Sequence, residues 1–205
     1  MKSRAATQAS MQSKPTDIIA LKKQQRREVI ARRDAVPEAL RAEKSAELCR
    51  HILSSTEYAK ANTIMLFKAF RSEADLSALE LQAERDGKIL LYPYCLPEGS
   101  MAALRPADGG AWTIDSYGIR TPIPEKSTEY APEKIDLVLC PCAGFDRGGH
   151  RLGMGAGYYD RFLPKCVNAR FIIAAFAEQE LPAIYTDEYD VRMHGIITDK
   201  EYIKG

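Results

Sequence analysis

The chain has 205 residues, of which 45% are hydrophobic and 28% are charged, and its formal net charge is +1 at pH 7. This composition is typical of a globular protein with a sizeable core. The balanced charge argues against broad binding to nucleic acid, and no apolar run approaches the roughly 18 residues of a membrane-spanning helix.

The first 16 residues contain three basic residues, several Ser, Gln and Ala, and no acid. An organelle-targeting leader is one interpretation of such a segment, but it is short and only weakly rich in Arg. We therefore expect residues 1–16 to be a disordered extension. Residues 17–205 are expected to form a single α/β domain.

Two helices are expected near the N-terminus, over 18–33 and from 38 to about 52. Pro15-Thr-Asp17 supplies a start signal for the first, and Val36-Pro-Glu38 opens the second, because Pro is favoured at the first helical position. The next elements are a strand over 63–67, a helix over 76–85 and a strand over 88–92 that ends at Pro93. This strand–helix–strand order predicts a right-handed crossover and a parallel sheet.

The stretch 97–134 is rich in Pro and Gly and yields only one candidate element, an edge strand over 101–105. Further strands are expected over 135–140, 171–176 and 195–198, with a helix over 158–165. Together these elements predict a three-layer α/β fold with a mostly parallel sheet flanked by helices and an N-terminal helical segment.

The five cysteines match neither a disulfide framework nor a zinc pattern. Cys140-Pro-Cys142 is the single close pair, and it admits a redox or metal interpretation. We favour two small residues at a buried strand end, because no second pair or His cluster completes a tetrahedral site. Reduced cysteines and the lack of a secretory apolar segment predict a cytoplasmic protein.

Six of the thirteen glycines lie between residues 144 and 157, directly before the helix expected at Tyr158. Glycines let the backbone approach a ligand closely, and a helix start with free N–H groups favours anions. Arg151 adds a planar cationic fork suited to phosphate. The loop therefore predicts phosphate binding over a plain surface loop. The spacing of Gly153, Gly155 and Gly157 argues against a dinucleotide fingerprint, and a Walker loop is excluded because no Gly-Lys-Ser/Thr follows.

The first helix is strongly basic. Lys22, Arg26 and Arg33 lie close to one face at spacings of four and seven, and this face could close over a polyphosphate. A solvated basic surface is the alternative interpretation.

These features together resemble the 5-formyltetrahydrofolate cyclo-ligase family, also called methenyltetrahydrofolate synthetases, over residues 18–203. The matching segments are Asp136-Leu-Val-Leu-Cys-Pro141, Gly144-Phe-Asp146, Gly149, Arg151-Leu-Gly153, Gly155 and Gly157-Tyr-Tyr-Asp-Arg161. Weaker matches are the basic first helix, Glu73, Tyr117-Gly-Ile119, and the tail around Asp190 and Thr198.

The resemblance implies ATP- and Mg2+-dependent cyclisation of 5-formyltetrahydrofolate to 5,10-methenyltetrahydrofolate, through a phosphorylated formyl intermediate, with release of ADP and phosphate. The implied ATP-binding residues are Lys22, Lys23, Arg26, Arg151, Leu152, Gly153, Met154, Gly155, Ala156, Gly157, Tyr158 and Tyr159. The implied folate-binding residues are Lys68, Glu73, Met154, Gly155, Ala156, Gly157 and Tyr158. Asp160 and Asp190 would hold the metal, because Mg2+ prefers oxygen ligands. We expect a monomer that binds neither nucleic acid nor membrane.

Three positions depart from the family pattern. Cys142 stands where family members usually have Gly, Met154 replaces an Arg or aromatic residue, and Ala156 replaces a Gly or Lys. Losing possible cations at 154 and 156 leaves Arg151 and the first helix to carry more of the phosphate charge. Neither His150 nor His194 is assigned a role.

Two other functions remain open on the residues alone. A sugar-phosphate isomerase would also use a phosphate loop, but it needs a clear proton-transfer base and no ATP. A module that binds folate or nucleotide without turnover is the second alternative, supported by the departures at Met154 and Ala156.

Overall fold

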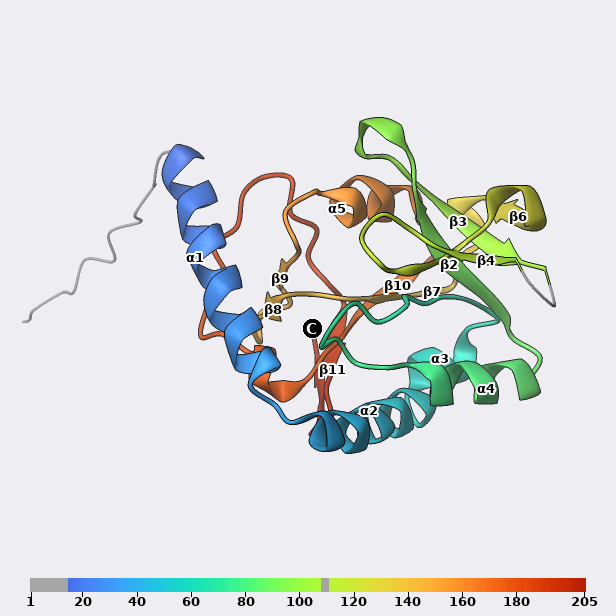
Figure 1. Cartoon of the computed structure of the whole chain (residues 1–205), viewed down its shortest axis with the longest axis horizontal. Helices are drawn as coiled ribbons and strands as arrows, with labels where there is room; N and C mark the ends of the chain where they lie inside the picture. Colours follow the sequence, from blue (N-terminus) through green and yellow to red (C-terminus); the bar gives the residue numbers. More distant parts are fainter. Residues whose placement is uncertain (1–14, 108–110) are drawn as a thin grey trace, which may run out of the picture.

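The centre of the fold is a sheet of eight strands in the order β12-β11-β10-β7-β1-β2-β3-β6 (Figure 1). The computed structural model describes residues 15–107 and 111–205. The five strands β11, β10, β7, β1 and β2 are parallel to one another, whereas β12, β3 and β6 each pair antiparallel with their neighbours. In chain order the eight are β1 (Thr63–Met65), β2 (Ile89–Cys95), β3 (Met101–Pro106), β6 (Ser127–Tyr130), β7 (Leu137–Cys140), β10 (Arg170–Ala174), β11 (Gly195–Ile197) and β12 (Tyr202–Lys204).

Two short antiparallel ribbons and five α-helices complete the fold. The ribbons pair β4 (Trp112–Ile114) with β5 (Arg120–Pro122) and β8 (Gly144–Phe145) with β9 (Arg151–Leu152). The helices are α1 (Pro15–Asp34), α2 (Glu38–Leu53), α3 (Thr56–Lys60), α4 (Ser77–Arg85) and α5 (Tyr158–Phe162). Short 3-10 turns are η1 (Pro97–Gly99), η2 (Pro124–Lys126), η3 (Pro132–Lys134), η4 (Leu163–Lys165) and η5 (Ala177–Gln179).

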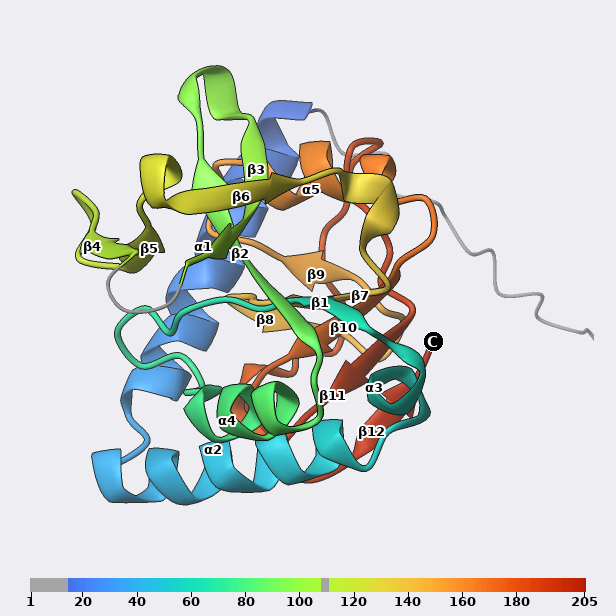
Figure 2. The same cartoon turned by 90° about the vertical axis from the view of Figure 1, so that its right-hand side faces the viewer.

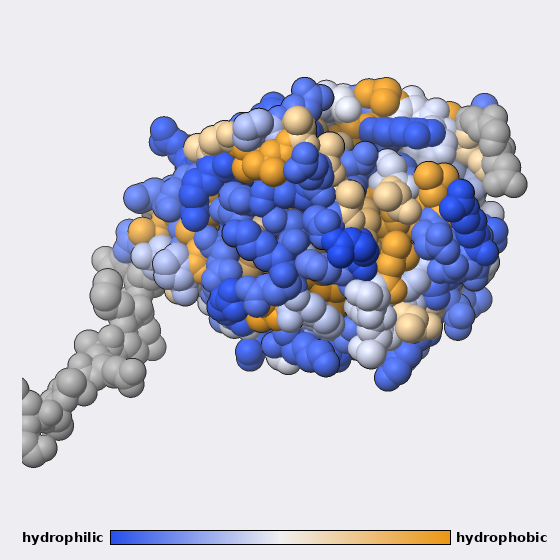
Figure 3. All heavy atoms as spheres, turned by 90° about the horizontal axis from the view of Figure 1, so that it is seen from below, coloured by the Kyte–Doolittle hydropathy of each residue, from blue (hydrophilic) through white to orange (hydrophobic). Residues whose placement is uncertain are grey.

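The sheet separates two hydrophobic cores, because successive strand residues point to opposite faces. Along β7, Leu137 and Leu139 pack in the core beneath α2 and α4, whereas Val138 and Cys140 pack in the core beneath α5. Figure 2 shows these helices on opposite sides of the sheet. The predicted three-layer fold is confirmed. Seen from below, the molecule presents mainly hydrophilic residues with scattered hydrophobic ones (Figure 3).

Helix α1 stands apart from these layers and packs against the β8–β9 ribbon (Figure 1). Val29 on α1 forms a third small core with Leu152, Leu181 and Ile184. The N-terminal helix is therefore tied to the segment that carries the glycine loop. Residues 1–14 of the expected extension lie outside the described residues, and Pro15 already begins the helix.

Two strand predictions were wrong. β2 was expected to end at Pro93 but continues to Cys95. The pairing of β2 with β1 ends at Leu91, opposite Met65, so Pro93 pairs only with β3 on its other side. A proline without an N–H donor is tolerated where one side of the strand is unpaired. β3 is not an edge strand, since β6 pairs with its outer side. None of the described helices has the length and hydropathy that a membrane crossing requires.

Candidate functional site

The glycine loop connects β9 to α5 over residues 153–157. Its backbone needs glycine at two points, since Gly155 and Gly157 have φ values of +105° and +69°. A side chain at Gly157 would also meet Arg161, whose nearest guanidinium nitrogen lies 2.7 Å from a Cβ placed there. The α-helix that follows is shorter than predicted, because it passes into η4 after Phe162. The dipole of so short a helix is correspondingly small.

Helix α1 contacts this loop directly. Arg26 Nε donates a hydrogen bond of 2.7 Å to the carbonyl oxygen of Gly153. Its half-buried guanidinium also lies within 3.4 Å of a Cβ position at Gly155. Burial lowers the pKa of Arg26 from its ordinary value. Lys23 is exposed on the same helix. The structure therefore places a permanent cation of α1 against the predicted phosphate loop.

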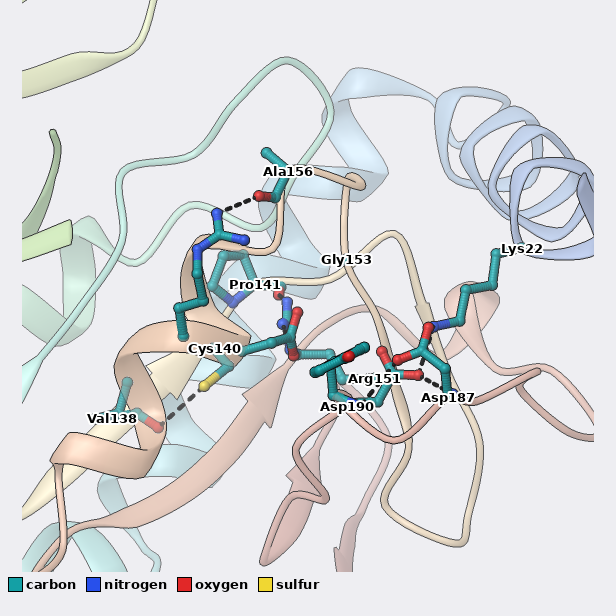
Figure 4. Close-up of polar contacts among 12 residues, drawn as sticks. Lys22, Val138, Cys140, Pro141, Arg151, Gly153, Ala156, Asp187 and Asp190 are labelled. Atoms are coloured by element: carbon teal, nitrogen blue, oxygen red, sulfur yellow. Dashed lines mark hydrogen bonds and ion pairs between the residues drawn. The ribbon is translucent and has the colours of Figure 1, made fainter. Parts of the chain in front are cut away.

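Lys22 is buried between two carboxylates of the 185–190 segment. Its Nζ lies 2.6 Å from Asp187 Oδ2 and 2.5 Å from Asp190 Oδ2 (Figure 4). Burial on its own lowers the pKa of Lys22, but the hydrogen bonds from both aspartates outweigh it and the pKa lies above its ordinary value. The amine is therefore charged at neutral pH, and it links α1 to the C-terminal segment.

Arg151 lies beneath the loop, with only 4% of its side chain exposed. One guanidinium nitrogen contacts Asp160 Oδ1 at 3.0 Å. Another donates to the carbonyl oxygen of Pro141 at 3.3 Å (Figure 4). The ring of Tyr159 lies 5.2 Å from the guanidinium carbon. The structure therefore directs the expected phosphate contact Arg151 inward, where it holds Asp160.

Among the residues that the structure describes, no hydrogen-bond donor contacts the second carboxylate oxygen of either expected metal ligand. Asp160 engages Arg151 through Oδ1, and Asp190 engages Lys22 and the Asp187 amide through Oδ2. Within residues 15–107 and 111–205, no three His, Cys, Asp or Glu side chains gather as a metal cluster. Mg2+ is commonly held by one or two carboxylates together with substrate phosphates and water, so this donor set fits the ion.

Two of the seven expected folate contacts, Lys68 and Glu73, follow β1. Lys68 Nζ lies 2.6 Å from both carboxylate oxygens of Glu80, and 4.9 Å from the ring centres of Tyr92 and Trp112. Glu73 is nearly buried and accepts a hydrogen bond from the backbone N–H of Phe70. Both expected residues are therefore fixed by protein contacts.

Arg161 is a neighbour of the loop that received no role in the sequence analysis. Its guanidinium donates to the carbonyl oxygens of Ala156 at 2.6 Å and Gly99 at 2.8 Å. It therefore supplies a cation beside position 156, while Met154 is exposed at the loop. The signal for Arg161 was its place in the matched motif. Asp187 was also missed, although it lies only three residues before Asp190.

The remaining polar candidates have structural roles. His150 Nδ1 contacts Asp146 at 3.0 Å within a tight turn, and His194 Nδ1 accepts a hydrogen bond from the Phe171 amide. Cys140 and Cys142 are free and buried, and burial raises the pKa of each thiol to about 12. These thiols are therefore protonated, as expected of buried strand-end residues.

Known proteins share this sequence and fold. The model of the 5-formyltetrahydrofolate cyclo-ligase family matches residues 18–199. The 5-formyltetrahydrofolate cyclo-ligase of Mycolicibacterium smegmatis is 30% identical over 188 residues, which cover 89% of this chain and 95% of that protein. The mouse 5-formyltetrahydrofolate cyclo-ligase is 27% identical over 168 residues, covering 77% and 83%.

Solved structures agree. The NMR structure of Aquifex aeolicus 5,10-methenyltetrahydrofolate synthetase has a TM-score of 0.79 at 25% identity, and covers 90% of this chain and 92% of that one. The Mycoplasma pneumoniae 5,10-methenyltetrahydrofolate synthetase has a TM-score of 0.72 at 20% identity, covering 87% and 98%, and supports the fold. The chain therefore belongs to the 5-formyltetrahydrofolate cyclo-ligase family, a family of ligases.

Proposed function

We propose that this chain uses ATP and Mg2+ to cyclise 5-formyltetrahydrofolate to 5,10-methenyltetrahydrofolate. The observation that carries the proposal is the direct contact between Arg26 of α1 and the backbone of the glycine loop. This contact closes a basic helix over a loop whose backbone can approach phosphate. The free thiols, four of them buried, suit a reducing compartment, and we propose a cytoplasmic monomer.

The proposed reaction starts with transfer of the γ-phosphoryl group of ATP to the formyl oxygen. This transfer turns that oxygen into a good leaving group and makes the formyl carbon electrophilic. The N10 amine attacks the carbon, loses its proton and closes the ring, while the C–O bond breaks and phosphate leaves. Phosphoryl transfer depends mainly on positioning and charge neutralisation. The loop backbone and the cations Lys23, Arg26 and Arg161 suit that task.

Each part of the site has one proposed task. Residues 151–159, together with Lys22, Lys23 and Arg26, would bind ATP, and Lys68 and Glu73 would bind the folate beside residues 154–158. Asp160 and Asp190 would hold Mg2+ through their free oxygens, and the ion would neutralise phosphate charge when bound. The ion pairs with Asp187 and Asp190 hold the charge of Lys22 beside Asp190, one of the two proposed metal ligands.

Purified protein with Mg-ATP is expected to convert 5-formyltetrahydrofolate to the methenyl product, which is followed by its near-ultraviolet absorbance. Production of ADP and phosphate should match product one to one. Folate binding without ATP hydrolysis would instead identify a binding module. Stabilisation by sugar phosphates but not by ATP, in a thermal-shift experiment, would favour the isomerase alternative.

Arg26→Ala is expected to lower kcat/KM for ATP about tenfold to a hundredfold, because it removes a charge-assisted phosphate contact of about 1.5–3 kcal/mol. The thermal midpoint should stay close to wild type, since Arg26 is half-exposed and makes one hydrogen bond within the protein. Steady-state kinetics with varied ATP checks this.

Arg27→Ala is the matched control for that variant, because Arg27 lies on the same helix but is exposed. It removes the same charge from α1 and should leave kcat/KM for ATP near wild type. Equal losses in the two variants would show that only the general charge of the helix matters.

A further inference from the structure

Arg33 is a buried cation at the C-terminal end of α1, and it has no place in the site described so far. It is only 1% exposed. Its Nε donates a hydrogen bond of 2.9 Å to Ser72 Oγ, and the Ser72 hydroxyl in turn donates to Asp34. This chain of contacts fixes the orientation of the guanidinium.

Another nitrogen of that guanidinium faces Glu73. Arg33 Nη1 lies 3.6 Å from Glu73 Oε1, and this buried nitrogen has no hydrogen-bond partner among the described residues. Burying a cation is costly, and well-packed apolar residues often serve a purely structural role at least as well. The charge of Arg33, directed at a carboxylate, therefore needs a reason beyond packing.

The loop between β1 and α4 holds Glu73 in a fixed position. The amide of Glu73 donates to the Phe70 carbonyl oxygen at 3.1 Å, and the Phe70 amide donates to Glu73 Oε2 at 3.1 Å. Arg71 within this turn has φ of +55°, a region that residues other than glycine rarely adopt. Such strain is kept where the surrounding contacts over-determine the backbone, and it often marks a functional site. The turn leaves Glu73 Oε1 directed at Arg33.

The groups around Glu73 set its charge. Burial raises the pKa of Glu73, whereas the Phe70 amide and the Arg33 guanidinium lower it, and the net pKa lies above its ordinary value. Among the described residues, Cys142 after β7 and Tyr159 on α5 are titratable groups that interact electrostatically with Glu73. The pKa of each of these is raised, so both are neutral at physiological pH. Arg33 is thus the cation that supports the ionised form of Glu73.

We infer that Arg33 is a positioning residue that orients Glu73 and keeps its carboxylate ionised for the folate. An ionised carboxylate only accepts hydrogen bonds, and the pterin ring of the proposed substrate carries neighbouring N–H donors. A protonated Glu73 would turn one acceptor into a donor and lose this match. The inference rests on the proposed function, since it takes Glu73 as a folate contact.

Arg33→Met tests the inference, because methionine fills a similar volume without charge. We expect KM for 5-formyltetrahydrofolate to rise about tenfold to a hundredfold, with KM for ATP within about twofold of wild type. The pH profile is the decisive readout. Only the carboxylate form binds well, so KM rises as the pH falls through the pKa of Glu73. A nearby opposite charge lowers a carboxyl pKa by about 1–3 units. Without Arg33 the rise should therefore begin about one pH unit higher, or more.

Two further variants separate positioning from folding. Arg33→Lys keeps the charge and should restore most of the wild-type pH profile, even if Arg33→Met folds poorly. The glutamine in Glu73→Gln cannot ionise, so KM for the folate should no longer rise at low pH. Adding Arg33→Met to Glu73→Gln should then change KM for the folate little. Arg27→Met, an exposed charge loss on α1, is the control and should match wild type.

The outcomes distinguish the inference from the proposed function. If the wild-type enzyme is active, two results would overturn the inference alone. One is a pH profile of the folate KM that does not shift in Arg33→Met, and the other is a shift in Arg33→Lys as large as that in Arg33→Met. Wild-type protein that neither binds nor cyclises 5-formyltetrahydrofolate, in calorimetry and absorbance assays, would overturn both.

Discussion

Arg151→Met is expected to destabilise the protein by about 3 kcal/mol and to abolish most of its ATP-dependent activity. Breaking a buried ion pair by removing one partner costs about 3–5 kcal/mol. The side chain of Asp160 remains 20% exposed and can be partly solvated, so we expect the lower end of that range. With about 2–4 °C per kcal/mol for a domain of this size, the thermal midpoint should fall by roughly 6–12 °C.

An arginine whose only contact is a phosphate at a loop surface could be replaced with little effect on the thermal midpoint. The structure instead buries Arg151 among Pro141, Tyr159 and Asp160. Burial on its own lowers the pKa of Arg151, but the Asp160 carboxylate and its other neighbours outweigh it, and the net pKa is raised. The charge is therefore kept inside the protein, and its loss affects both stability and the site.

Arg151→Lys is the informative companion variant. Lysine keeps the charge but lacks the fork that reaches Pro141 and Asp160 together. It should recover part of the stability and little of the activity. Differential scanning calorimetry and kinetics below the lowered midpoint check both. An unchanged thermal midpoint in Arg151→Met would contradict the prediction that the buried Arg151–Asp160 pair stabilises the protein.

The parallel strands could be predicted because each is a short, uninterrupted apolar run with polar residues or Pro at its ends. Ile64 to Leu66 and Leu137 to Cys140 have no polar interruption, and the structure buries them on both faces of the sheet. The first helix was also predicted. Its inward face, however, includes the charged Lys22 and Arg33, which sequence patterns alone assign more readily to a solvated surface.

The antiparallel half of the sheet was largely missed. β6 contains two exposed polar residues and only four residues in all, so no periodicity marks it. Its place depends on pairing with β3, a contact across more than twenty residues of sequence. Long-range pairing of this kind leaves little local signal, and Pro-rich segments such as 122–132 obscure what remains.

The sequence motif identifies candidate site residues, but it does not predict which side chains they pair with. The motif identified Arg151 and Asp160 as site residues, and the structure pairs them with each other. Lys22 was assigned to ATP, and the structure holds it between Asp187 and Asp190. These pairings join positions up to 168 residues apart, and spacing within one helix or loop cannot supply them.

Asp190→Asn is expected to raise the magnesium requirement about tenfold or more, because a neutral amide is a weaker ligand for a hard cation than a carboxylate. Changes to residues behind a metal's ligands already cost about 10–100-fold, and loss of a ligand should cost at least that. Asp160→Asn should behave similarly. The double variant should lose less than the sum of the two free-energy losses, because both acids would share one ion.

Asp187→Asn provides the matched control for this prediction. Asp187 and Asp190 bind the same Lys22 amine at almost equal distances, so either change removes the same kind of ion pair. Only Asp190 is proposed to contact the metal. Activity titrated with Mg2+ should therefore shift for Asp190→Asn and stay near wild type for Asp187→Asn, with excess Mg2+ restoring part of the first. Equal shifts in Asp187→Asn and Asp190→Asn would trace the effect to Lys22 rather than to a metal ligand. Magnesium titrations of Asp160→Asn and Asp190→Asn that match wild type would contradict the assignment of Mg2+ to these carboxylates.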